Sequence, residues 1–176
     1  MTRCYRTCME KELFNQFGWE LTMEEASLPD GRKKKLVRVH RCDSVHILAF
    51  DKDCNVLLLR EFRPFYGKYI WMLPSGRVDK ENDIETAAQR ELQEETGFRS
   101  KSLTHYCTTQ HSESMNFANH IFIAKDLTED PLKQDDHELI EVHAMPLEEA
   151  IEKVLSSPVI HTASAFALLR YTHEHP

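Results

Sequence analysis

The sequence lacks any hydrophobic run that approaches the roughly 20 residues needed to cross a bilayer, so a membrane protein is not expected. It has no apolar signal segment at its start, and its cysteines number five, an odd count. Reduced thiols in a cytoplasmic protein are therefore expected. Basic clusters are also scarce: the net charge is −7, and the longest basic stretch is Arg32-Lys33-Lys34-Lys35. A groove for nucleic acid is not expected.

Internal repeats and low-complexity segments are absent as well. The chain has 176 residues, of which 41% are hydrophobic. That length and composition suffice for one domain with a substantial core, and the length is too short for two domains of ordinary size. One domain is the expectation.

The hydrophobic pattern predicts strands first, a central helix, further strands, and then helices near the C-terminus. Period-2 alternation or short apolar runs predict strands at 19–24, 35–40, 44–50, 55–60, 102–109, 120–124 and 140–145. The first two of these are expected to form a hairpin around Leu28-Pro29-Asp30-Gly31, and the third and fourth to form another. Helical spacing occurs in residues 147–155 and 162–171. This order favours a mixed α+β sandwich over a doubly wound sheet.

The central helix carries an unusual group of charges. Glu91, Glu94 and Glu95 are three or four residues apart, so their side chains share one helix face. Like charges at this spacing oppose the helix by roughly 0.2–0.5 kcal/mol per pair unless a positive charge lies on them. Mg²⁺ is bound in proteins by one or two carboxylates together with substrate phosphates, which indicates phosphate-ester or pyrophosphate chemistry.

The plain alternative is a solvated surface helix that happens to be rich in glutamate. Its flanks argue against that reading: Gly76 leads the loop before the helix, Arg90 stands beside the first glutamate, and Gly97 follows the last. A solvated helix needs none of these features.

The segment resembles the Nudix box, G-x5-E-x7-R-E-U-x-E-E-x-G-U, where U is apolar, of hydrolases that cleave nucleoside diphosphates linked to another moiety. Eight of the nine fixed positions match: Gly76, Arg90, Glu91, Leu92, Glu94, Glu95, Gly97 and Phe98. Asn82 stands where the pattern has Glu, a position that the family uses as a partner for the box arginine. Locally, Asn82 could instead cap the helix, with Glu85 three residues later. The resemblance implies a Nudix fold, an α/β/α sandwich with a mixed sheet.

The resemblance extends over most of residues 17–170. Arg60-Glu61-Phe62-Arg63 and the segment 73–79, LPSGRVD, are similar to segments of ADP-ribose pyrophosphatases and their nucleoside-diphosphate-sugar relatives. That branch carries an N-terminal strand element exchanged between two subunits. The resemblance therefore implies such an element at residues 1–42, a Nudix hydrolase domain at 43–176, and a homodimer.

Two departures bear on the substrate. Met72 stands where the branch usually has Glu, and residues 111–114 lack the Pro that is usual in ADP-ribose pyrophosphatases. Other sugar nucleotides, such as GDP-mannose or UDP-glucose, therefore remain open beside ADP-ribose.

The resemblance also assigns roles to residues. Mg²⁺, or Mn²⁺ as an alternative, would be bound by Glu91, Glu94, Glu95 and the Ser75 carbonyl, with Glu94 also counted as catalytic. The general base is expected in the acidic loop after the box, at Glu138 or, as second choice, Asp136. His111 and His137 match no family position, but the ordinary pKa of histidine, near 6.5, makes them further alternatives. The expected substrate contacts are Arg63, Arg60, Gly76 and Trp19.

Three functions remain open at this stage. The first is a diphosphatase that acts on ADP-ribose or a related sugar nucleotide. The second is a Nudix enzyme for a dinucleoside polyphosphate, a coenzyme or an oxidised nucleotide. The third is a non-catalytic nucleotide sensor, which the intact set of Glu91, Glu94 and Glu95 disfavours because a pure binder has no need to crowd like charges.

Overall fold

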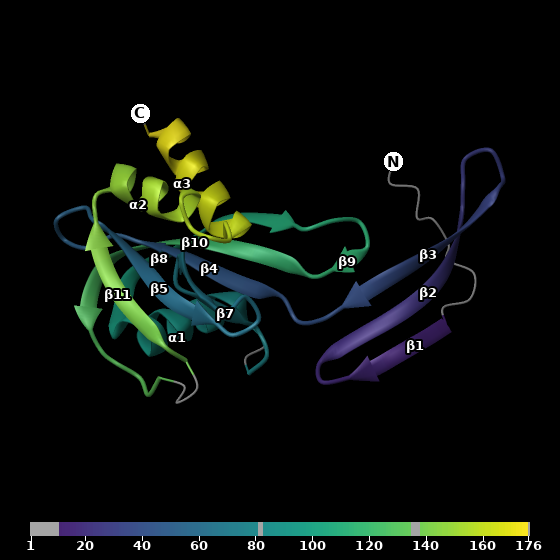
Figure 1. Cartoon of the computed structure of the whole chain (residues 1–176), viewed down its shortest axis with the longest axis horizontal. Coiled ribbons are helices and arrows are strands. Elements are labelled where there is room, and N and C mark those ends of the chain that lie inside the picture. The colour runs from purple at the N-terminus through teal and green to yellow at the C-terminus, as the bar shows by residue number, and fades with distance from the viewer. Residues whose placement is uncertain (1–10, 81–82, 135–137, 176) are drawn as a thin grey trace. The chain divides into compact units, whose positions relative to one another are not determined.

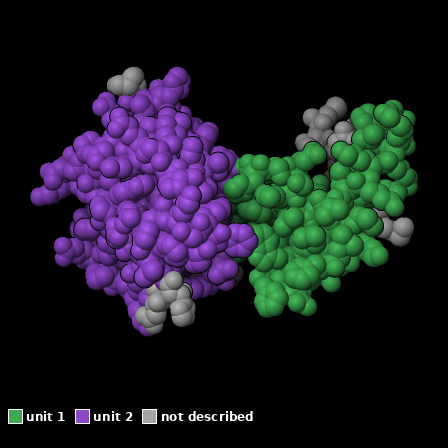
Figure 2. Space-filling view, viewed as in Figure 1, with its two compact units in different colours: residues 1–43, 110–118 green, residues 44–109, 119–176 purple. Residues whose placement is uncertain are grey.

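The computed structural model describes residues 11–80, 83–134 and 138–175, and the chain divides into two compact units (Figure 2). Unit 1 comprises residues 1–43 and 110–118, and unit 2 comprises residues 44–109 and 119–176. The sequence pattern did not predict that residues 110–118 join the N-terminal strands.

Unit 1 contains one four-stranded sheet, in the order β1-β2-β3-β9. Its strands are β1 (Lys11–Gln16), β2 (Trp19–Ser27), β3 (Lys33–His40) and β9 (Met115–Asn116). β1, β2 and β3 run antiparallel, and β9 pairs parallel with β3. The hairpin predicted around Gly31 is confirmed as β2–β3: the Gly31 N–H donates to the Leu28 carbonyl at 2.9 Å, and Gly31 has a φ of 85°.

Unit 2 contains two sheets, in the orders β7-β4-β10-β8 and β11-β5-β6 (Figure 1). The strands are β4 (Ser44–Ala49), β5 (Val56–Arg63), β6 (Lys68–Met72), β7 (Ser75–Arg77), β8 (Phe98–Gln110), β10 (Ala118–Glu129) and β11 (Ile140–Met145). β4 runs parallel to β10 and antiparallel to β7, while β5 runs antiparallel to both β6 and β11.

The hairpin predicted from residues 44–50 and 55–60 is wrong. β4 and β5 meet at the bridge between Phe50 and Val56 and then belong to different sheets. The tight turn is real, because the Asp51 carboxylate accepts the N–H groups of Asp53 and Asn55, each at 2.8 Å. Both strands are buried on both faces, and each takes other partners along its edges.

Three helices cover these sheets: α1 (Ile84–Thr96), α2 (Leu147–Leu155) and α3 (Thr162–Glu174) (Figure 1). β4 supplies both layers of the core, because Val45 and Ile47 pack with α1 whereas Leu48 packs with α2 and α3. This alternation makes an α/β/α sandwich and confirms the predicted α+β class.

The start of α1 differs from the prediction. Asp83 is the N-cap, and its carboxylate accepts both the Thr86 N–H at 2.8 Å and the Thr86 hydroxyl at 2.7 Å. Asn82, the predicted cap, lies outside the described residues. The helix ends at Gly97, which has a φ of 78° and donates its N–H to the Gln93 carbonyl.

Two further expectations concern the whole chain. In the described part of the chain, no helix is long and apolar enough to span a bilayer. Cys42, Cys54 and Cys107 carry free thiols, and the other two cysteines lie outside the described residues. The cytoplasmic location inferred from the cysteines stays a prediction.

Candidate active site

The turn before α1 interlocks with that helix at two neighbouring residues. The Ser75 N–H donates to Oε2 of Glu95 at 2.7 Å. At Gly76, an added Cβ would overlap the carboxyl group of Glu91, so only glycine leaves room for that side chain. β7 holds the turn in place by pairing Ser75 with His46 and Gly76 with Val45 on β4.

Of the box glutamates, Glu95 is buried and Glu91 is partly buried. The side chain of Glu91 is 12% exposed, and Glu95 is 6% exposed. Burial raises the pKa of Glu91 to about 7; Arg90 opposes this rise, and the charges of Glu94 and Glu138 add to it. Burial also raises the pKa of Glu95 well above its ordinary value, and Glu91 is the largest of the charges that add to the rise. Two carboxyl groups in this condition favour a bound proton or a bound cation.

Glu61 is a site residue that the sequence analysis missed. It lies on β5 and is 4% exposed, and burial raises its pKa. The Arg63 guanidinium, 3.0 Å from Oε2, opposes that rise, while Glu138 adds to it. Oε2 is nevertheless a buried atom without a hydrogen bond of acceptable geometry. A signal existed: Glu61 follows Leu57 and Leu59 at period 2 on a buried strand.

Arg90 supplies the positive charge on the crowded helix face. Its Nη1 lies 2.6 Å from Oε2 of Glu94 and 2.9 Å from Oε1 of Glu91, and its Nη2 donates to the Arg77 carbonyl at 3.2 Å. The repulsion inferred from the sequence is therefore partly offset within α1 itself. Glu94 is also the more accessible carboxylate, with its side chain 22% exposed.

The predicted metal ligands are close together but are engaged with protein donors. Within residues 11–80, 83–134 and 138–175, no three or more His, Cys, Asp or Glu side chains already form a set of metal ligands. The donor set fits a hard divalent cation all the same, because such ions prefer carboxylate oxygens. Oε2 of Glu61 accepts no hydrogen bond from the described residues, and the pKa of Glu91 is raised. The negative charges of these two carboxylates are therefore only partly balanced by neighbouring protein groups.

The two candidates for the general base have different outcomes. Glu138 is exposed, and its charge adds to the raised pKa of Glu61, Glu91 and Glu95. Asp136 lies outside the described residues, as does His137.

Arg60 and Arg63, the two arginines on β5, have different neighbours. Arg63 contacts Glu61 and lies 3.2 Å from the Met72 sulfur, so the chain has a thioether beside Arg63 where the related branch has a carboxylate. Arg60 contacts Glu141 and not the carboxylates of the candidate site. It donates to both oxygens of Glu141, at 2.8 and 3.0 Å, and its guanidinium lies 4.2 Å from the Tyr69 ring centroid. Strand alternation separates them, since Arg63 shares the parity of Glu61.

Trp19 belongs to an aromatic cluster in unit 1. The Arg41 guanidinium lies 4.7 Å from the Trp19 ring centroid and 5.5 Å from that of Phe117. His111, the alternative base, also lies in unit 1 and packs against Phe117 with ring centroids 5.2 Å apart. Flat rings beside a guanidinium form a surface on which a further ring could stack.

The NUDIX domain family matches residues 40–163, which span the turn, the box helix and β5. The chain belongs to this family. It is a Nudix hydrolase, in keeping with a relative of that activity that matches over most of its length. Nudix hydrolases generally use a divalent metal ion.

Three similar proteins illustrate the relationship. The ADP-ribose pyrophosphatase of Bacillus subtilis (strain 168) is 30% identical over 93% of this chain and 90% of its own length. The methanol dehydrogenase activator of Bacillus methanolicus is 23% identical over the same shares. A crystal structure of an ADP compounds hydrolase superposes with a TM-score of 0.80 at 21% identity, covering 99% of this chain and 96% of its own, which shows the shared fold alone.

Proposed function

We propose that this protein hydrolyses the pyrophosphate bond of ADP-ribose or a related nucleoside diphosphate sugar, in a reaction that depends on Mg²⁺, and releases a nucleoside monophosphate and a sugar phosphate. The observation that carries the proposal is the carboxylate group beside the Ser75–Gly76 turn, in which Glu61 and Glu95 are buried and Glu91 is partly buried. The similarity to an ADP-ribose pyrophosphatase at 30% identity supports the substrate class.

Glu91, Glu94, Glu95 and the Ser75 carbonyl are the groups that would hold the metal, and Glu61 is positioned to join them. When bound, the ion would withdraw charge from the diphosphate oxygens and lower the pKa of a coordinated water. Arg90 contacts Oε2 of Glu94, so Oε1 is the oxygen of that carboxylate that would take part.

Glu138 is the proposed general base. It is exposed, so it can reach a water molecule at the edge of the carboxylate group, and its charge already acts on Glu61, Glu91 and Glu95. Its role would be to take a proton from the attacking water. Asp136 remains the second choice.

Arg63 is the proposed contact of the diphosphate. Among the described residues, the carboxylate that contacts it is that of Glu61, and the thioether of Met72 does not neutralise its charge. A guanidinium in this state can donate two parallel hydrogen bonds to phosphate oxygens. We propose that Trp19 stacks on the base of the nucleotide, whereas the bonds of Arg60 to Glu141 give that arginine a mainly structural role.

The experiment is a substrate panel. ADP-ribose, GDP-mannose, UDP-glucose, a dinucleoside polyphosphate and an oxidised nucleoside triphosphate are each incubated with Mg²⁺, Mn²⁺ or EDTA, and the products are separated chromatographically. We expect AMP and ribose 5-phosphate from ADP-ribose, with activity lost in EDTA. Full activity in EDTA, or turnover confined to the last two compounds, would reject the proposal.

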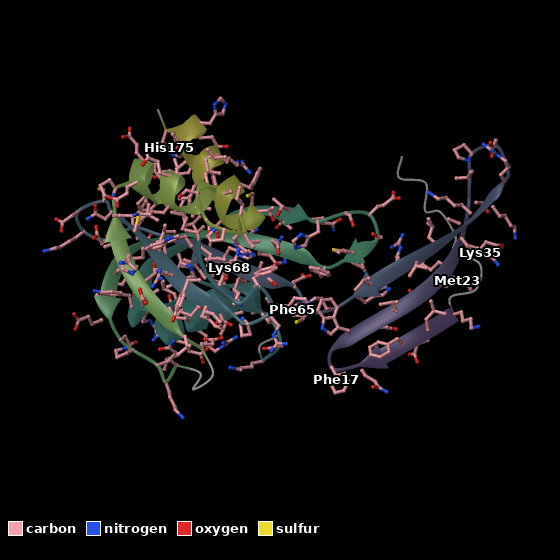
Figure 3. The ribbon with its side chains drawn as sticks, viewed as in Figure 1. Phe17, Met23, Lys35, Phe65, Lys68 and His175 are labelled. Atoms are coloured by element: carbon pink, nitrogen blue, oxygen red, sulfur yellow. The ribbon has the colours of Figure 1, made fainter. Side chains whose placement is uncertain are left out.

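We further propose that the protein is a homodimer through the sheet of unit 1. Cross-strand pairing places Phe14, Leu21, Val39 and Met115 in one row on one face, with the pair Met23 and Val37 beside it. Phe14, Val37 and Met115 are at least 38% exposed, and Phe17 projects from the β1–β2 turn with 88% exposure (Figure 3). The described elements of unit 1 are strands of this one sheet, and a sheet must bury its apolar face against another layer. A second copy, exchanging residues 1–42, is the proposed layer.

A further inference from the structure

The Leu73–Gly76 turn is held by three elements of the fold. The Pro74 carbonyl accepts the Ile47 N–H from β4 at 2.8 Å, and the Ser75 N–H donates to Glu95 of α1. The third contact comes from the C-terminal helix α3, where the hydroxyl of Ser164 accepts the Leu73 N–H at 2.9 Å. α1 and α3 cover different faces of the sandwich, so the turn is fixed from both layers.

Ser164 is built as a buried polar contact. It is 0% exposed, and its Oγ lies 2.7 Å from Nδ1 of His161. Oγ accepts the Leu73 N–H, and the tautomer of His161 with an unprotonated Nδ1 would accept the Ser164 hydroxyl proton and so orient the hydroxyl. His161 in turn packs against His46, with ring centroids 5.2 Å apart, and His46 is the residue paired with Ser75 across β4 and β7.

The same strand edge provides an internal comparison. β6 is the outer strand of its sheet, and the Trp71 N–H on that edge donates to the hydroxyl of Ser157 at 3.1 Å. Ser157 bonds a backbone N–H within β6, and Ser164 bonds in the same way the N–H of the residue that follows the strand. The difference is that Leu73 leads directly into the turn that carries Ser75, whereas Trp71 lies within β6.

We propose that Ser164, oriented by His161, is a positioning residue for the active site, which holds the Leu73–Gly76 turn so that Ser75 and Gly76 stay aligned with Glu95 and Glu91. The inference rests on the proposed metal site at this turn. On this proposal α3 stabilises metal binding through the turn, although it contributes no residue to the carboxylate group. Loss of such outer contacts typically lowers metal affinity or activity by about 10- to 100-fold.

The test compares Ser164→Ala with the matched control Ser157→Ala. Amide hydrogen exchange at Leu73 and Ser75 is measured by NMR in the metal-free protein, and Mn²⁺ binding is measured by calorimetry. For Ser164→Ala we expect faster exchange at both amides and Mn²⁺ affinity lowered about 10- to 100-fold. For Ser157→Ala we expect the denaturation midpoint to shift by about as much as for Ser164→Ala. Its Mn²⁺ affinity and its exchange at Ser75 should remain those of the wild type.

Wild-type exchange at Ser75 together with wild-type Mn²⁺ affinity in Ser164→Ala would overturn the proposal, as would an equal loss of affinity in both variants. If Ser164→Ala does not fold, His161→Ala keeps the hydroxyl but removes its orienting partner; it should show a smaller loss of the same kind, and wild-type affinity there would overturn the proposal. Failure of the wild-type protein to bind Mn²⁺ would instead count against the proposed function, and amide exchange would still decide whether Ser164 holds the turn.

Discussion

Glu91 occupies the space that a side chain at position 76 would need. The carboxyl group packs directly over the Cα of Gly76, so the glycine that leads the box and the first glutamate of the helix form one steric unit. The requirement at this position is close approach, because Gly76 does not have the positive φ of Gly18, Gly31, Gly67 and Gly97.

Gly76→Ala should therefore displace the Glu91 carboxyl and lower kcat by about 100-fold, the scale expected for a misplacement of about 1 Å. Overpacking should also lower the free energy of unfolding by about 1–3 kcal/mol. Steady-state kinetics and urea denaturation measure the two effects. Ser75→Ala is the control, because it keeps the backbone N–H that Glu95 accepts and should retain most activity. An active Gly76→Ala enzyme would show that the position of Glu91 is unimportant.

Glu95→Gln separates catalysis from stability. Glutamine can still accept the Ser75 N–H, while the variant loses one of the buried negative charges that act on one another. We expect kcat to fall by orders of magnitude while the metal-free protein is as stable as the wild type or more so at pH 8. Glu94→Gln should lose activity as well but gain no stability, because it removes the negative charge that lies 2.6 Å from Arg90. Thermal melts in EDTA compare the two variants.

The Nudix box predicted the family, and the hydrophobic pattern predicted several elements. β11 and α2 have the bounds expected from the pattern, and α3 begins where predicted. β1 was missed because all its residues are exposed, so its sequence has no buried face to recognise. Glu61 was missed because its charge suggested an exposed residue, although its period-2 spacing after Leu57 and Leu59 indicated the buried face of the strand. Contacts such as that of Ser164 with Leu73 join residues far apart in sequence, so no local sequence pattern predicts them.

The raised pKa of Glu91 predicts a pH dependence of stability in the metal-free protein. Because its pKa rises from 4.5 to about 7 on folding, the folded state binds more protons than the unfolded state between these values. The stabilisation is fully present below pH 4.5 and is lost as pH rises through 7, with a slope of at most about 1.4 kcal/mol per pH unit. Urea denaturation in EDTA from pH 5 to 8 should show this decline.

Glu91→Gln should flatten that decline, because its amide does not titrate. Glu141→Gln is the matched control: Arg60 holds the pKa of Glu141 below its ordinary value, so its ionisation is complete before the window opens. A decline of the same size in Glu91→Gln and the wild type would assign the effect to another group.

The apolar face of unit 1 predicts a dimer that one charge can break. Val37→Asp places a carboxylate on the face that holds Leu21, Met23 and Val39, and burying it against a second copy would cost several kcal/mol. We expect a monomer by light scattering at micromolar concentration. Lys34→Asp, on the opposite face of β3, should remain dimeric. Deleting residues 1–42 should abolish both dimerisation and substrate binding, and an active monomer would contradict the proposed exchange.

Glu138→Gln should depress the chemical step far more than substrate affinity. A base acts on the proton of the attacking water, so its loss appears in kcat and leaves ground-state binding nearly unchanged. The residual rate should recover as pH rises, because hydroxide replaces the missing base. Removing the charge of Glu138 should also lower the pKa of Glu91 and Glu95, which its charge now raises, so the pH profile should shift to lower pH as well. Asp136→Asn should do less. If Glu138→Gln keeps wild-type kcat at neutral pH and saturating substrate, the base lies elsewhere, and Asp136 or His111 is the next residue to test.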